Sequence, residues 1–288
     1  MKTSGKLAII FAVIFVAFAV AGGLLIAQGG IEVISENEKL AEFLENASVY
    51  VADLEFSNHD YEKIDFSYSY KPDGELETIK IEDLKAYDIR FKYADTDSVT
   101  FDFSGKYPSD YIEKYAIIDS GTFEVDDASD DLPVNFDYSG RELTMSLEQP
   151  VNISGGVKGT VTITIPNDKL YNITLDGIIS NQDIENVKAA RFEAVSCIGN
   201  ISIEGNISSF CIDSCIGNVD LSTDSRLTEK SIVTSNIGNT DIELADRRVT
   251  IEKSDNIGKV RLDDVNTSGG VTIEITDNIG DVTVESDD

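Results

Sequence analysis

The stretch Ser196-Cys197-Ile198-Gly199-Asn200-Ile201-Ser202-Ile203 contains a short phrase, an apolar residue followed by glycine and a polar residue, that occurs five times before the C-terminus. The later copies begin at Ser214, Ser235, Asp255 and Asp277, and successive glycines lie 18 to 22 residues apart. A period near 20 residues is typical of proteins that stack repeated units into an array. These repeats therefore decide the fold of the C-terminal half.

Apolar residues alternate on both sides of the glycines, less regularly in the third and fourth repeats, where Ser231 and Lys253 stand in the apolar columns. The apolar residues stand two and four places after the glycine, as in Ile201 and Ile203, and seven and five places before it, as in Phe192 and Ala194. Such alternation predicts two short strands, each with one buried face. Because one repeat is too thin to bury its own apolar face, we expect the repeats to stack about 4.8 Å apart. The predicted fold is all-β, a parallel single-chain β-solenoid, right-handed because parallel crossovers usually are.

The repeat also predicts structural tasks for its polar and small residues. A glycine at each corner permits a tight turn or a positive φ. Asparagines two places before the glycine, and others one place after it, can hydrogen-bond along the stack as a ladder; a calcium site using Asp255, Asp277 or Asp281 is the alternative. The expected corners are Gly177, Gly199, Gly217, Gly238, Gly258 and Gly280, with Gly177 in a degenerate first repeat. The asparagines are Asn236, Asn256 and Asn278 before the glycine, and Asn200, Asn218 and Asn239 after it.

Two of the three cysteines occupy one column of the repeat. Cys197 and Cys215 each stand two places before a glycine, in neighbouring repeats. Adjacent strands bring Cα atoms within disulfide range, so a Cys197–Cys215 bridge is one interpretation. The other is that two small side chains fill a stack.

The N-terminus predicts an exterior location for the repeats. An uninterrupted apolar run from Leu7 to Ala27 is long enough to cross a bilayer. We predict a cytoplasmic stub at 1–6 and an uncleaved transmembrane signal-anchor at 7–28; cleavage near Ala21 is the alternative. Basic residues precede the run and acidic ones follow it, so the domain after Gln28 is expected outside the cell membrane.

The remaining chain divides into three expected parts. A juxtamembrane helix or cap is predicted at 31–47, where Ser35 and Glu38 form a capping box. Residues 48–165 alternate in several stretches and form either early, irregular coils of the solenoid or a separate β-sandwich. Residues 166–288 hold the regular repeats. Aromatic residues concentrate in the middle part and are expected in the core or in cross-strand pairs, with an exposed sugar platform as the alternative. They are Tyr68, Tyr70, Phe91, Tyr93, Phe101 and Phe103.

The chain is strongly acidic. It has 53 acidic and 23 basic side chains among 288 residues, a formal net charge of −30. Such a field repels nucleic acid, so we expect no nucleic-acid partner. Six Asn-X-Ser/Thr sequons fit glycosylation on an exterior surface. They begin at Asn46, Asn152, Asn172, Asn200, Asn206 and Asn266.

The order of these features resembles a known family. A membrane span, β-rich sequence, the strand Val161-Thr162-Ile163-Thr164-Ile165-Pro166 and the repeated glycine phrases are similar to the putative adhesin family of prokaryotic surface proteins. The resemblance covers roughly Phe91 to the end. It implies a membrane-tethered extracytoplasmic β-helix of unknown function, without an assigned reaction or catalytic residues. This chain departs from the commoner Ser-Gly-Asp-Ile sequence, since it uses Cys-Ile-Gly-Asn or Asn-Ile-Gly-Asn.

The Gly-x-Ser-x-Gly and His-Glu-x-x-His motifs, the phosphate loop and the dinucleotide-binding fingerprint are absent from the sequence. His59 is the single histidine, and Arg247 and Arg248 are the one basic doublet among the repeats. We predict no catalytic residue, no cofactor and no metal site. The predicted function is that of a non-catalytic cell-surface adhesive or structural protein anchored in the membrane. Its expected partner is an envelope glycan or protein. The alternative is an envelope glycan-acting lyase or hydrolase, which would use clustered carboxylates with a basic residue or a metal.

Overall fold

A computed structural model describes residues 61–72, 74–85, 87–108, 121–124, 134–147, 159–246, 248–263 and 265–286. The ordered elements are the strands β1 (Tyr61–Tyr70), β2 (Thr78–Glu82), β3 (Tyr87–Ala94), β4 (Val99–Pro108), β5 (Gly121–Glu124), β6 (Val134–Ser139), β7 (Glu142–Leu147), β8 (Gly159–Pro166), β9 (Tyr171–Asp176), β10 (Gln182–Val195), β11 (Ile201–Ile207), β12 (Phe210–Asp213), β13 (Val219–Thr223), β14 (Ser231–Thr234), β15 (Thr240–Leu244), β16 (Arg248–Ser254), β17 (Val260–Asp263), β18 (Asn266–Thr276) and β19 (Val282–Ser286). The all-β prediction is confirmed for these residues.

The predicted membrane span at 7–28 and the predicted helix at 31–47 lie outside the described residues. Within the described ranges, no helix is long and apolar enough to cross a membrane.

A five-stranded sheet in the order β3-β8-β4-β1-β5 comes first. Strand β4 pairs antiparallel with β1 and β8, whereas β3 pairs in parallel with β8. Its core is aromatic: the rings of Phe66 and Phe103 stack at 4.9 Å, and Tyr68 meets Phe103 edge to face. Tyr68, Phe91, Phe101 and Phe103 are buried, while Tyr70 and Tyr93 are partly buried against the same core. The expectation of aromatic core residues is confirmed.

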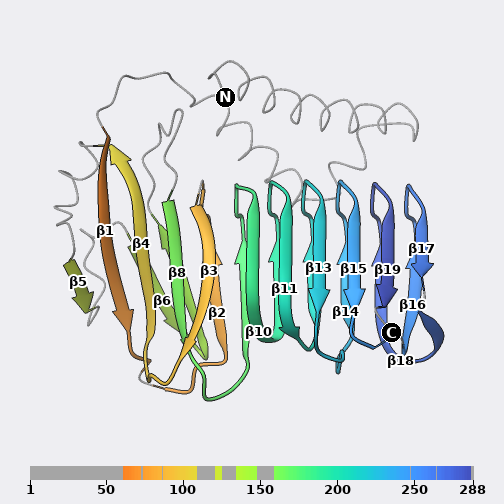
Figure 1. The fold of residues 1–288 in the computed structure, drawn as a ribbon, viewed down its shortest axis with the longest axis horizontal. Coiled ribbons are helices and arrows are strands. Elements are labelled where there is room, and N and C mark those ends of the chain that lie inside the picture. The colour runs from red at the N-terminus through yellow and green to blue at the C-terminus, as the bar shows by residue number, and fades with distance from the viewer. Residues whose placement is uncertain are drawn as a thin grey trace. The chain divides into compact units, whose positions relative to one another are not determined.

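The repeats build a second sheet from two rows of parallel strands. We number the repeats 1 to 5 by their glycines, Gly199, Gly217, Gly238, Gly258 and Gly280. The strands before the glycines form a first row and the strands after them a second row. The long strand β10 joins the rows, because its first part pairs with β11 and its last part with β12. Figure 1 shows β10, β11, β13, β15, β19 and β17 of the second row side by side in that order.

The spatial order of the repeats differs from their order in the sequence. Repeat 5 (β18 and β19) lies between repeat 3 (β14 and β15) and repeat 4 (β16 and β17). Repeat 4 is therefore the outermost unit, although it precedes repeat 5 in the chain. The first row is also non-sequential at its other end, where β2 lies between β7 and β9 in parallel.

Two departures from the repeat pattern now have physical reasons. Lys253 stands in the core column beside Ile275, and it can be exposed because repeat 4 has no described repeat beyond it. A charge at this inward position opposes further strand addition. Ser231 is buried and accepts the Phe210 amide N–H through Oγ at 3.1 Å, so a hydroxyl replaces an apolar side chain with its hydrogen bond satisfied.

Candidate functional site

A buried ladder runs through the position two places before each glycine. Asn236 and Asn278 are each 1% exposed. The Asn236 amide N–H donates to Asn278 Oδ1 at 3.2 Å, and the Asn278 amide N–H donates to Asn256 Oδ1 at 3.2 Å. Each side-chain Nδ2 donates to a carbonyl of the neighbouring repeat, as Asn236 does to Ile212 O at 3.3 Å. The ladder predicted for these asparagines is confirmed.

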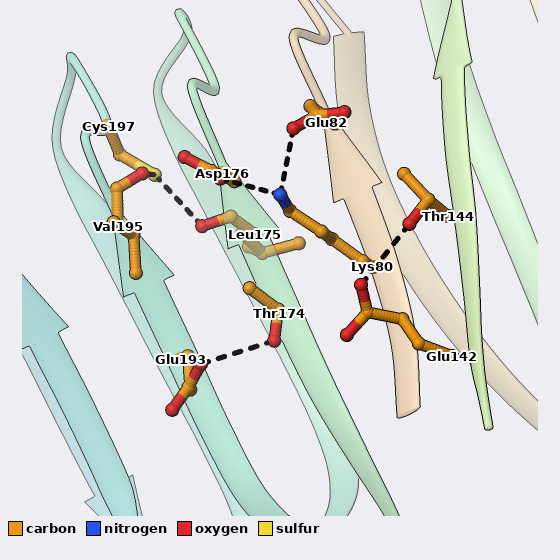
Figure 2. A network of polar contacts seen from close by, with 10 residues as sticks. All are labelled: Lys80, Glu82, Glu142, Thr144, Thr174, Leu175, Asp176, Glu193, Val195 and Cys197. Carbon is orange, nitrogen blue, oxygen red and sulfur yellow. Dashed lines mark hydrogen bonds and ion pairs between the residues drawn. The ribbon is translucent and has the colours of Figure 1, made fainter. Parts of the chain in front are cut away.

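Cysteines form the first two members of the same column. Cys197 Sγ donates to Leu175 O at 3.7 Å, as Figure 2 shows, and Cys215 Sγ donates to Ala194 O at 3.5 Å. These thiols thus occupy the place of the asparagine Nδ2 groups. Both are free and buried in the structure. A hydrogen bond with Cys197, together with burial, raises the pKa of the Cys215 thiol well above its usual value. The Cys197–Cys215 disulfide stays a prediction.

A second ladder follows the position after each glycine and is exposed. The backbone N–H of each member donates to the side-chain Oδ1 of the member in the preceding repeat in space, at 2.9–3.1 Å. In spatial order its members are Asn181, Asn200, Asn218, Asn239, Asp281 and Lys259. Lys259 ends the series. It needs no acceptor in its side chain because no described repeat follows it.

The corner glycines allow neighbouring repeats to approach closely. Gly217 has φ 137°, and a Cβ there would overlap the carbonyl of Gly199. Gly199, Gly238, Gly258 and Gly280 share this geometry. Gly177 lies in a different column, because Ile179 pairs with Ile198 and Ser180 therefore takes the place of Gly199. With φ 66°, Gly177 instead aligns with Ser196, so its expected equivalence to the other glycines was wrong by three positions.

Each repeat also holds a non-glycine residue with positive φ, which the sequence analysis did not foresee. These residues stand three places before the glycine: Ser196, Ser214, Ser235, Asp255 and Asp277, with φ between 52° and 57°. The recurrence of serine or aspartate at one position was the available signal, since short polar side chains tolerate this conformation better than most.

A seam separates the five-stranded sheet from the second row. Strands β3 and β10 are neighbours but do not pair. Gln182, 4% exposed, bridges them: its Nε2 donates to Tyr87 O at 2.7 Å, and its Oε1 accepts the Ile89 amide N–H at 3.0 Å. Farther along, the Tyr93 hydroxyl accepts the Lys188 amide N–H at 2.7 Å. Side chains thus replace a strand ladder at this seam.

A groove of about 510 Å³ lies along the seam and is the candidate functional site. We call it the seam groove. Its lining consists of Asp88, Arg90, Asn181, Gln182, Asp183, Asn200, Ile201, Ser202, Asn218 and Asp220. It combines carboxylate acceptors, a guanidinium and side-chain amides. This mixture can hydrogen-bond a ligand that has both donors and acceptors.

A separate polar cluster lies on the first row and has a structural role. Figure 2 shows Lys80 between the carboxylates of Glu82 and Asp176, each at 2.8 Å from Nζ. Burial disfavours the charged ammonium, but hydrogen bonds and attraction from Asp176 and Glu82 raise its pKa overall. Because Lys80 and Asp176 come from the paired strands β2 and β9, the cluster holds these two strands together.

The other candidate residues have the following places. His59 lies outside the described residues, and Arg248 donates to Asp246 at 3.0 and 3.1 Å. Among the described residues, no group of three His, Cys, Asp or Glu side chains could hold a metal ion. Asp281, a ligand in the calcium alternative, accepts the Lys259 amide N–H through Oδ1 and pairs with Arg261 through Oδ2 at 2.9 Å.

Glycosylation stays a prediction at all six sequons. Asn200 and Asn206 are exposed, and Asn172 is partly buried in β9. Asn266 begins β18, whereas Asn46 and Asn152 lie outside the described residues.

Among the comparisons with known proteins, only the one with solved structures found similar proteins. No model of a protein family matches the chain, and no curated protein matches it. A putative cell adhesion protein of Clostridium sporogenes is similar at 11% identity, with 80% of this chain and 100% of that one covered and a TM-score of 0.39. A putative adhesin of Bacteroides fragilis has 12% identity, 79% and 98% coverage and a TM-score of 0.44. One of Parabacteroides distasonis has 12% identity, 80% and 98% coverage and a TM-score of 0.30. Likeness at this level establishes neither family nor function.

Proposed function

We propose that the chain is a right-handed β-solenoid, anchored in a cell membrane by residues 7–28, that binds or organises envelope components outside the cell without turning over a substrate. It acts as an adhesive or structural surface protein. Its partner is an envelope glycan or protein.

This proposal rests on one observation: the recurring asparagines, cysteines and glycines of the repeats all have structural roles. The asparagines of both ladders and the cysteines of the buried one form hydrogen bonds between neighbouring repeats, and the corner glycines allow close approach. Such ladders give a regular stack with outward side chains at fixed intervals of about 4.8 Å. A rigid surface of this kind suits binding over an extended area.

The thiols support a non-catalytic role. Burial raises the pKa of Cys211 to about 11, and the pKa of Cys215 is also raised. Because the thiolate is the nucleophile, these groups are poor nucleophiles near neutral pH.

Sedimentation with isolated envelopes tests the proposal. The full chain in detergent micelles should co-sediment with envelopes, and the supernatant should contain no released sugars or peptides. Failure to co-sediment would contradict the binding role.

A glycan-acting enzyme is the second candidate, because one observation favours it. The seam groove brings Asp88, Asp183 and Asp220 near Arg90, which is the combination of carboxylates and a basic residue that such chemistry uses. Sugar release that an Asp183→Asn or Asp220→Asn substitution abolishes would establish this candidate and overturn the first.

A further inference from the structure

We propose that the seam groove binds a neutral sugar chain, laid across repeats 1 and 2. This inference rests on the proposed function, since it names the chemistry of the envelope partner. It is carried by the order of donors and acceptors in the groove.

The donors come from the exposed ladder. The Oδ1 atoms of Asn181, Asn200 and Asn218 each accept the backbone N–H of the next member. Because the oxygen is held, the orientation of each amide is fixed. Among the described residues, the Nδ2 group of none of the three has a hydrogen-bond partner. The groove therefore presents N–H donors in a row, one for each repeat spacing of about 4.8 Å.

The acceptors form a parallel column on the strands that begin directly after these asparagines. Asp183, Ser202 and Asp220 are in-register partners on β10, β11 and β13. Their side chains all point outward, because the alternate residues Gln182, Ile201 and Val219 are buried. A ligand across the strands would meet acceptors at the same interval as the amide donors. The hydroxyl groups of a sugar ring donate and accept at once, so they can use both columns.

The charge of the groove selects among ligands. Three carboxylates and one guanidinium lie in its lining, from Asp88, Asp183, Asp220 and Arg90. This balance repels an anionic glycan. A lysine-rich peptide would pair with the carboxylates, but its ammonium groups accept no hydrogen bonds, so only its backbone carbonyls could accept from the amide and guanidinium donors. A neutral oligosaccharide satisfies both sets.

The test compares three probes by isothermal titration calorimetry with the full chain in nanodiscs. The probes are a neutral oligosaccharide set, chitohexaose and cellohexaose, then oligogalacturonate, then a lysine-rich peptide. The protein is produced in a host that does not N-glycosylate, because Asn200 lies in a sequon. We expect binding of a neutral oligosaccharide and none of the other two probes.

Two pairs of variants locate the binding. Asn200→Asp keeps the ladder acceptor, as Asp281 does at its own position, and removes the outward donor. Its control is Asn239→Asp, in the same ladder but outside the groove. Asp220→Ala removes an acceptor, and its control is the in-register partner Asp241→Ala. We expect Asn200→Asp and Asp220→Ala to weaken binding about tenfold each, and the controls to bind like the parent chain.

Other results would overturn this inference. They are binding of oligogalacturonate or the peptide in preference to the neutral sugars, equal losses in groove and control variants, or no binding of any oligosaccharide. The envelope sedimentation assay is separate, so the chain can co-sediment with envelopes even where the groove proposal fails.

Discussion

The carboxylate of Asp281 accepts the backbone N–H of Lys259 at 2.9 Å, so repeats 4 and 5 are neighbours. The same column joins Asp281 to Asn239, whose Oδ1 accepts the Asp281 amide N–H at 3.1 Å. Repeat 5 is thus held on both sides, by repeat 3 and by repeat 4. The hydrogen bonds that each ladder residue makes therefore depend on which repeats are its neighbours in space, and not on their order in the sequence.

This direction of bonding predicts unequal effects of two alanine substitutions. Asn218→Ala removes the acceptor of the Asn239 amide and should lower the free energy of unfolding by about 1 kcal/mol. Lys259→Ala removes no acceptor from any described residue and should change it by less than about 0.5 kcal/mol. Denaturant titrations of the two variants measure both values. Equal losses would contradict the ladder direction.

Gly217→Val should damage the stack severely. Valine at φ 137° is strained, and its Cβ would overlap the Gly199 carbonyl of the neighbouring repeat. We expect a loss of about 3 kcal/mol or more, against almost none for the exposed Asp241→Ala. Thermal melts of the two variants decide the matter, and similar melting temperatures would remove the argument for close approach at the corner.

Alkaline pH should destabilise the fold through buried phenols. Burial raises the pKa of Tyr68 to about 12, and it raises that of Tyr93 to about 12 despite the opposing backbone hydrogen bond with Lys188. In the unfolded chain these groups ionise near pH 10. Since the unfolded state loses its protons first, their stabilising effect is complete below about pH 10 and falls as the pH rises toward 12.

The variant Tyr93→Phe tests this dependence. It lacks one shifted phenol, so its free energy of unfolding should fall less steeply between about pH 10 and 12 than that of the parent chain. Parallel curves for the two proteins would count against the buried-phenol explanation.

The membrane topology leads to a further prediction. The basic residues before the apolar run from Leu7 to Ala27 predict that the N-terminus lies in the cytoplasm and that the rest of the chain lies outside. Protease added to intact cells should therefore remove an epitope fused to the C-terminus. Protection of that epitope would reverse the topology, and a mature chain that begins after Ala21 would indicate cleavage.

The strands, the corners and the asparagine ladders could be predicted from the sequence because each depends on a local phrase. The order of the repeats was missed, since a period of about 20 residues is the same whichever repeats are neighbours. Signals did exist: Lys253 in a core column and Lys259 in the asparagine column both mark repeat 4 as outermost.

The seam groove could not be predicted, for a different reason. Asp88 and Arg90 lie on β3, far in the sequence from Asp183 and Asp220. They meet across a seam where the side chains of Gln182 and Tyr93 bridge two strands that do not pair. A side-chain bridge of this kind leaves no periodic pattern.

A pair of deletions tests most directly the central claim that repeat 5 lies between repeats 3 and 4. Removal of residues 247–264 takes away the outermost repeat, and the stack of repeats 1, 2, 3 and 5 should keep a cooperative thermal melt within a few degrees of the full chain. Removal of residues 265–288 takes away the partner of both β16 and β17, and a clearly lower melting temperature is expected. The reverse ranking of the two melting temperatures would contradict this order of repeats.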